Sequence, residues 1–256
     1  MTKMLFIDIE TAPILANVWG LWKNNVGLSQ IETDWYIMSF CAKWSDSSEV
    51  IYMDGRFTPE DDYDMLLELH KLLDDADFVV AHNGDKFDIK KIKARMIMSG
   101  LRPPAPFKTI DTLKIAKKEF AFTSNKLAYL TDALCDTKKL DHAKFAGFEL
   151  WAQCLKGNMD AWDEMKDYNI VDVLALEELY YVLRPWYSSH PSVSAYDDNE
   201  EVSCPKCNST DVHKRGFFYT NKGKFQRYRC SCCGGWSSST YTENTKEKRQ
   251  SLLAAR

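Results

Sequence analysis

The feature that most constrains this chain is a pair of carboxylates at the end of its first apolar run. Residues 4–9 have the pattern of a β-strand, and Asp8 and Glu10 lie two positions apart at its end. Alternation along a strand places both acids on one face, which is costly unless a cation lies between them. Hard divalent ions such as Mg²⁺ or Mn²⁺ take oxygen ligands. The pair therefore indicates metal-assisted phosphoryl chemistry, and a strand with a merely acidic exposed face is the alternative.

The apolar pattern beyond this strand predicts a mixed β-sheet flanked by helices, an α/β fold. Further strands are expected at residues 35–44, 49–53, 78–82 and 107–112. Helices are expected at residues 59–75, beginning near Pro59, then through Ile89, Ile92 and Met96, and over most of residues 113–186. Residues 12–33 read as a long irregular segment. The 256 residues are enough for one large domain and a small one.

Two later segments place acids where chemistry could use them. Asp88 follows the strand at 78–82 and lies in the first turn of the next helix, where the helix dipole already favours an acid. We expect Asp85 to cap that helix and Asp88 to serve chemistry. Tyr168 and Asp172 are four positions apart on a helix, so they share a face with apolar neighbours and Asp172 should point inward. A surface Tyr–Asp contact is the alternative.

Three motifs in this order resemble the exonuclease motifs of the DEDD superfamily, in its tyrosine-bearing (DEDDy, DnaQ-like) branch: Asp8-x-Glu10, Asn83-x-x-x-Phe87-Asp88 and Tyr168-x-x-x-Asp172. The resemblance covers about residues 3–186. It implies a ribonuclease-H-like fold and 3′–5′ exonuclease activity. Compact chains of this type resemble those encoded by phages or used in DNA replication and repair.

The resemblance also implies a role for each site residue. Asp8 would bridge two Mg²⁺ or Mn²⁺ ions, and Glu10 and Asp172 would hold the ion beside the attacking water. Asp88 would bind the second ion, and Tyr168 would orient or help deprotonate the water. Two ions about 4 Å apart can clamp an in-line transition state between the attacking and leaving oxygens.

Substrate contacts are predicted around these motifs. Trp19 and Trp22, in the irregular segment, could stack on terminal bases, whereas Trp35 is expected to pack over the sheet. Asn83 and Phe87 of the second motif are expected to face the nucleic acid. A second group of side chains could contact phosphate: Lys138, Lys139, His142 and Lys144.

Five of the eight cysteines lie close together near the C-terminus. Cys204 with Cys207 and Cys230 with Cys233 form two Cys-x-x-Cys pairs separated by 22 residues, which favours one structural Zn²⁺ bound by four thiolates. Between them, strand-like runs at 216–219 and 225–229 flank a turn, and the whole resembles a zinc ribbon. Cys232 is left over and could replace a neighbour.

The excess of basic residues lies in the same C-terminal segment as the clustered cysteines. Residues 201–256 carry 11 Lys and Arg against 4 Asp and Glu, a balance of +7, while the whole chain carries −4. A basic module on an acidic body is typical of contact with a polyanion, and a plainly solvated surface or a protein partner from replication or repair is the alternative. The expected nucleic-acid contacts in this module are Lys214, Arg215, Arg227 and Arg229.

These observations predict a metal-dependent 3′–5′ exonuclease that acts on nucleic acid, with single-stranded DNA favoured. The expected organisation is an exonuclease domain at 1–186, a linker at 187–202, a four-cysteine zinc ribbon at 203–242 and a basic tail at 243–256. No secretory signal or membrane-spanning run is evident, so a cytoplasmic protein without a membrane partner is expected. A non-catalytic nucleic-acid-binding adaptor and a structure-selective endonuclease are the alternatives.

Overall fold

The computed structural model describes residues 2–138, 144–198 and 200–253. The chain divides into two compact units, one formed by Lys3–Tyr180 and the other by residues from Tyr181 onward together with Thr2. Within the described residues, no helix has both the length and the apolar character needed to cross a membrane.

A five-stranded mixed sheet forms the centre of the first unit, in the order β5-β4-β1-β6-β7. Its central strand pairs antiparallel with β4 and parallel with β6, and β6 pairs parallel with β7. The strands are β1 (Met4–Thr11), β4 (Ile37–Trp44), β5 (Val50–Asp54), β6 (Phe78–Ala81) and β7 (Lys108–Asp111). The mixed sheet predicted from the apolar pattern is confirmed.

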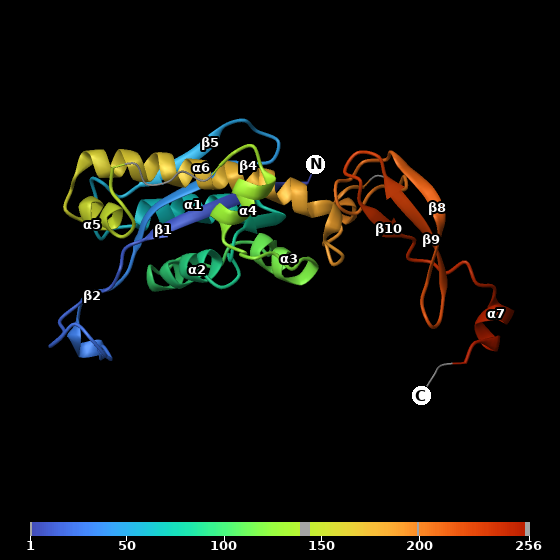
Figure 1. Ribbon diagram of the computed structural model, residues 1–256, viewed down its shortest axis with the longest axis horizontal. Coiled ribbons are helices and arrows are strands. Elements are labelled where there is room, and N and C mark those ends of the chain that lie inside the picture. Colours follow the sequence, from blue (N-terminus) through green and yellow to red (C-terminus); the bar gives the residue numbers. More distant parts are fainter. Residues whose placement is uncertain (1, 139–143, 199, 254–256) are drawn as a thin grey trace. The chain divides into compact units, whose positions relative to one another are not determined.

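Helices cover both faces of this sheet, and the central strand β1 is therefore buried on both sides. One face packs against α1 (Tyr63–Asp75) and α2 (Asp88–Met98), and the other against the long helix α6 (Met159–Leu183), whose Tyr180 ring lies 5.6 Å from that of Phe6. Figure 1 shows this arrangement. The remaining helices are α3 (Thr112–Glu119), α4 (Leu127–Leu134) and α5 (Glu149–Leu155).

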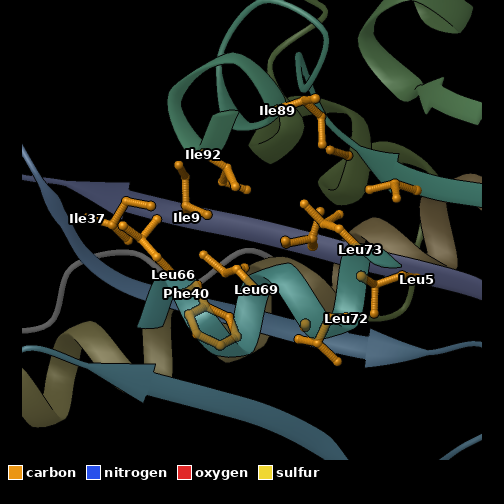
Figure 2. Packing of buried hydrophobic residues seen from close by; sticks show 14 of the residues in the cluster. Leu5, Ile9, Ile37, Phe40, Leu66, Leu69, Leu72, Leu73, Ile89 and Ile92 are labelled. Carbon is orange, nitrogen blue, oxygen red and sulfur yellow. The ribbon is translucent and has the colours of Figure 1, made fainter. Parts of the chain in front are cut away.

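The main core lies between the sheet and helices α1 and α2. Figure 2 shows Leu5 and Ile9 of β1 facing Leu69 and Leu73 of α1, with Ile92 of α2 beside them. These side chains recur every two residues on the strand and every three or four on the helices, which is how each element presents a single apolar face. The opposite face of β1 is left to carry Asp8 and Glu10.

The first helix begins later than expected. It begins at Tyr63 and not near Pro59, because Glu60 has a φ of 68°, which lies outside the right-handed helical region. The N-cap residue is Asp62, whose side chain does not cap the helix. Its carboxylate accepts the backbone N–H of Ile37 at 2.9 Å and pairs with Arg95 of α2 at 2.7 Å. This buried acid therefore joins β4, α1 and α2.

The irregular segment after β1 also contains short strands. β2 (Leu15–Ala16) pairs with β3 (Ile31–Thr33), and a 3-10 turn, η1 (Leu28–Gln30), lies between them. Figure 1 shows this two-stranded excursion extending away from the five-stranded sheet. Strands of two or three residues are too short to give a period in the sequence.

The second unit contains a three-stranded antiparallel sheet, in the order β10-β9-β8. Its strands are β8 (Val212–Tyr219), β9 (Lys224–Cys230) and β10 (Trp236–Ser238). The two longer strands contain the runs expected from the sequence, and β10 was not expected. Short helical segments complete the unit: η2 (Arg184–Trp186), η3 (Val193–Tyr196) and α7 (Lys246–Ser251).

Truncation of the core should destabilise the first unit strongly. Leu69 is 0% exposed in α1, so Leu69→Ala should lower the free energy of unfolding by about 2–5 kcal/mol through lost burial and a residual cavity. Leu28 is 89% exposed, and Leu28→Ala should change it by less than about 0.5 kcal/mol. Urea unfolding followed by circular dichroism measures both, and equal losses would contradict this core assignment.

Candidate active site and metal centre

The acids of β1 lie on the face of the sheet that packs against α6. Asp8 is opposite Cys41, and Glu10 is opposite Ser39, in the antiparallel register of β1 and β4. Both acids are partly buried, in contrast to the fully buried Ile9 between them. The alternation predicted for Asp8 and Glu10 is therefore the geometry that the strand adopts.

The carboxylate of Asp8 is held by a buried amide from α6. Asn169 is fully buried, and its Nδ2 donates to Oδ2 of Asp8 at 2.6 Å, while its Oδ1 accepts the hydroxyl of Ser39 at 3.2 Å. One side chain thus joins β1, β4 and α6. Sequence reasoning did not assign Asn169 a role, although its position three residues before Asp172 puts it on the same inward helix face.

Asp172 and Tyr168 are both buried on α6. Burial, followed by the negative charges of Asp8 and then Asp172, raises the pKa of the Cys41 thiol well above its usual range, so both acids lie near Cys41. The ring of Tyr168 packs edge-on against Trp151, with centroids 6.0 Å apart. The structure therefore places the Tyr-x-x-x-Asp pair on the acid-bearing face of the sheet.

Asp88 reaches this region from the start of α2. Its Oδ1 accepts the backbone N–H of Ile9 at 3.2 Å, which places the carboxylate beside β1 between Asp8 and Glu10. Burial, and secondarily the charge of Asp111, raises the pKa of Asp88 to about 7. A carboxyl of this kind ionises readily only when a positive charge lies beside it.

The expected helix cap at Asp85 is wrong. The N-cap residue of α2 is Phe87, which offers no side-chain acceptor, and Asp85 instead pairs with Lys114 of α3 at 2.5 Å. A tertiary ion pair has thus replaced a local cap.

A strained turn positions Asp88 at the end of β6. Asn83 has a positive φ of 70°, and its N–H is accepted by Oδ1 of Asp111 at 2.9 Å. A Cβ at Gly84 would approach the Cβ of Ala81 to 2.4 Å, so only glycine fits there. The same Asp111 oxygen caps α3 by accepting backbone N–H groups of its first turn. Asp111 is a site residue that sequence reasoning missed, since its role depends on contacts across the sheet.

The donor atoms of this site suit hard divalent cations. Asp8, Glu10, Asp88 and Asp172 offer only carboxylate oxygens, which are the ligands that Mg²⁺ and Mn²⁺ prefer. Within the described residues, only the four clustered cysteines bring three or more candidate ligand atoms to within 4.8 Å of one another. The acids are therefore spaced more widely than the ligands of a single small ion.

An open cavity of about 440 Å³ begins at Thr11, the residue that follows Glu10 in β1. Its lining includes Trp151, which contacts Tyr168, and Trp35, whose ring lies 3.5 Å from Nζ of Lys91. The other lining residues are the four that follow Glu10 in the chain (Thr11, Ala12, Pro13 and Ile14) and Phe148. The cavity therefore combines aromatic walls with a cation, and Trp151 connects it to Tyr168.

The other predicted substrate contacts are dispersed. Trp19 is 101% exposed and Trp22 is 86% exposed, both in the excursion between β2 and β3. Phe87 is half-exposed beside Lys91. In the predicted phosphate loop, Lys144 pairs with Asp160 and Lys138 donates to backbone carbonyls of α4, while Lys139 and His142 lie outside the described residues.

The cysteines of the second unit form a compact cluster. The sulfur atoms of Cys204, Cys207, Cys230 and Cys233 all lie within 4.8 Å of one another, with Cys204 and Cys233 3.7 Å apart and Cys207 and Cys230 3.6 Å apart. Cys232 is exposed and lies outside this cluster. Four thiol ligands in this arrangement suit a tetrahedral Zn²⁺.

The two Cys-x-x-Cys pairs have matching backbone turns. Asn208 donates its N–H to the carbonyl of Cys204 and has φ 59°, while Gly234 donates to the carbonyl of Cys230 and has φ 73°. In both, the fourth residue after the first cysteine adopts the left-handed conformation that glycine and asparagine tolerate best. The two turns therefore present their sulfurs in the same way.

Known proteins resemble this chain in family and in fold. The model of the RNase_H superfamily matches residues 5–184. The chain belongs to this superfamily. A search of curated proteins finds no match. Among solved structures, the family B DNA polymerase from the hyperthermophilic archaeon Pyrobaculum calidifontis is similar in fold, with a TM-score of 0.51, 12% sequence identity and 73% of this chain covered. The chain spans 26% of that polymerase. RNase_H superfamily membership favours a nuclease.

The raised pKa of Asp88 should make stability depend on pH. The unfolded carboxyl titrates near about 3.9 and the folded one near about 7, so the native state binds the extra proton between these values. In protein free of divalent ions, this contribution to stability is complete below about pH 4 and is lost as the pH rises through about 7. Asp88→Asn should remove this component from the pH dependence of the unfolding free energy, measured with urea.

The exposed acid Asp167 on α6 provides the control for this measurement. Asp167→Asn should give a curve parallel to that of the wild type, because no buried carboxyl is removed. If Asp88→Asn also ran parallel to the wild type between about pH 4 and 7, the assignment of a buried, protonated Asp88 would be wrong.

The cysteine cluster distinguishes two neighbouring cysteines. Cys233→Ser removes a ligand and should abolish stoichiometric zinc binding and unfold the small sheet, because modules of this size depend on their metal. Cys232→Ser should retain one zinc per chain, since Cys232 lies outside the cluster. Elemental analysis of the purified full-length variants measures the zinc content, and loss of zinc from Cys232→Ser would contradict the ligand set.

Proposed function

We propose that this protein is a metal-dependent 3′–5′ exonuclease of the DEDDy type, with single-stranded DNA as the favoured substrate. The observation that carries the proposal is that Asp8 and Glu10 lie on the face of β1 that packs against α6, which carries Tyr168 and Asp172. Asp88 of α2 joins them at the backbone of β1, where its Oδ1 accepts the N–H of Ile9. Family membership and the shared fold support a nuclease, and this constellation is what favours an exonuclease.

The chain's residues divide the work of binding and positioning. Asp8, fixed by Asn169, would bridge two cations, and Asp172 and Glu10 would hold the ion nearest Tyr168. Asp88 would hold the other ion, after losing the proton that burial favours. Two Mg²⁺ or Mn²⁺ ions bound there would lower the pKa of a water and stabilise the leaving 3′-oxygen. The Tyr168 hydroxyl would orient that water toward the scissile phosphorus.

The adjoining cavity would receive the 3′-terminal nucleotide. Its volume of about 440 Å³ lies within the range of small-ligand pockets, and Trp35 and Trp151 offer rings against which a base can pack. The ammonium of Lys91 lies in the same cavity and could contact a phosphate. The 3′ end of a single strand would enter this cavity directly, whereas the 3′ end of a duplex would first have to unpair. This difference favours single-stranded DNA as the substrate.

Two alternatives use the same fold. A binding adaptor requires no intact acid set, whereas all four acids and Tyr168 are present here. A structure-selective endonuclease would need a path for continuous strands past the site.

The buried thiols of the first unit and the clustered thiols of the second suit a reducing compartment, and we propose the cytoplasm. On the basis of the proposed activity, we also propose a role in DNA replication or repair, whether the protein is encoded by a phage or by a cell.

Cleavage assays test the proposal directly. With Mg²⁺ or Mn²⁺, the wild type should shorten 5′-labelled single-stranded DNA from its 3′ end and produce a ladder. Asp172→Asn should lower the rate by more than about a hundredfold, since loss of a metal ligand exceeds the effect of an outer partner. The matched variant Asp167→Asn, which changes an exposed acid of the same helix, should retain activity.

Two further substrates, together with a binding measurement on the linear DNA, separate the alternatives. A labelled RNA of the same sequence compares the two polymers, and faster RNA cleavage would overturn the preference for DNA. A circular single strand should stay intact, and its cleavage would favour the endonuclease. If linear DNA is bound but not shortened with either metal, the adaptor replaces the exonuclease.

A further inference from the structure

One face of the small sheet of the second unit is covered around Tyr228, although Tyr219 at its far end is exposed, and the other face is open. These are called the covered face and the open face. Along β9, the side chains of Lys224, Gln226 and Tyr228 alternate with those of Phe225, Arg227 and Arg229. Tyr228 lines a cavity of about 390 Å³ together with Val212, Ser237 and part of the segment 192–205, so its face is covered by chain from the same unit. The face of Arg227 and Arg229 has no such cover among the described residues, and both arginines are exposed.

The open face is basic and aromatic. Strand pairing places Arg229 opposite both His213 of β8 and Trp236 of β10, and places Phe225 opposite Phe218. Trp236 is 46% exposed and Phe218 is 49% exposed. Two exposed rings therefore lie among basic side chains on this face.

The arginines and the tryptophan form a preorganised group. The guanidinium of Arg227 lies 4.8 Å from the centroid of the Trp236 ring, and that of Arg229 lies 6.0 Å from it. Arg227 also donates its Nε–H to the carbonyl of Arg215 at 2.9 Å, which fixes its direction across the β8 bulge. Within the described residues, no carboxylate forms an ion pair with Arg227 or Arg229, so their charges are available to an anion.

The charge of the whole module selects the class of partner. Residues 203–242 contain seven Lys and Arg and one Asp, a balance of +6. Four zinc-bound thiolates would add a net charge of about −2, which still leaves the module basic. Exposed rings with flanking arginines on a basic surface are typical of proteins that bind single-stranded nucleic acid, because bases stack on the rings while arginines contact the phosphates.

We propose that the open face of β8, β9 and β10 is a second nucleic-acid site, where single-stranded DNA or RNA stacks on Trp236 and Phe218 and its phosphates contact Arg215, Arg227 and Arg229. Lys214 lies opposite Tyr228 and therefore on the covered face, which separates it from the three arginines. The site is independent of the carboxylates, and it would increase affinity for a strand without taking part in cleavage.

The test measures binding by the full-length protein. The probe is fluorescein-labelled oligothymidine, and every variant also carries Asp172→Asn so that cleavage does not consume the probe. Trp236→Ala should weaken binding by about 5- to 100-fold, the range for loss of one base–aromatic stack. Tyr219→Ala removes an exposed ring from the other face of the same sheet and should leave affinity within about twofold of the parent.

A charge-matched pair of variants tests the arginines. Arg227→Ala with Arg229→Ala should weaken binding and reduce the slope of log K against log salt by about 1.4, because about 0.7 is expected for each phosphate contact on a single strand. Lys222→Ala with Lys224→Ala removes the same charge from the turn and the covered face, and should reduce the slope much less. Zinc content of each variant confirms that the cluster has formed.

The outcomes are decisive for this site alone. If the tryptophan and arginine variants bind like their parent, the open face does not bind nucleic acid and a protein partner becomes the assignment. If both double variants weaken binding equally, attraction by net charge replaces a defined face. Failure of the wild type to cleave DNA would overturn the exonuclease and leave this binding result unaffected.

Discussion

One buried amide is the constraint on which the acidic site depends. Asn169 binds Asp8 through its nitrogen and Ser39 through its oxygen, so its orientation is fixed by the two different partners. A buried amide that lost either partner would leave a polar group unsatisfied, at a cost of about 1–3 kcal/mol. The same contact that stabilises α6 on the sheet therefore fixes the carboxylate that two cations would share.

The rest of α6 docks through a polar seam that continues from this amide. Cys41 lies beside Asp172, and Lys43 forms a buried ion pair with Glu177 at 2.7 Å, before Phe6 and Tyr180 close the seam with aromatic packing. A buried ion pair adds little net stability compared with apolar packing, but removing one partner leaves a buried charge. A shift of the helix by one turn would break every contact in this seam, which fixes the axial position of Tyr168 and Asp172.

Parts of this structure were predictable because they depend on local pattern alone. β1, β4 and α2 follow from apolar runs and helical spacing, and the two Cys-x-x-Cys pairs follow from ligand spacing. The start of α1 was wrong because Glu60 adopts a positive φ, and the cap at Asp85 was wrong because that acid binds Lys114. The positions of Asn169 and Asp111 in the site depend on long-range contacts that no local period encodes.

Ligand chemistry keeps the two proposed metals of this chain apart. The first unit offers carboxylate oxygens, which are hard ligands that suit Mg²⁺ and Mn²⁺, and the second offers four thiols, which suit Zn²⁺. Zinc bound to four thiolates has no open coordination position, so it would stabilise the small sheet without reacting. The widely spaced acids leave room for water and phosphate oxygens beside the ions, which is what phosphoryl chemistry requires. The four-thiol site would therefore disfavour Mg²⁺ and Mn²⁺, which prefer oxygen ligands, whereas the carboxylate site suits them, so donor type supports two different metals in the two units.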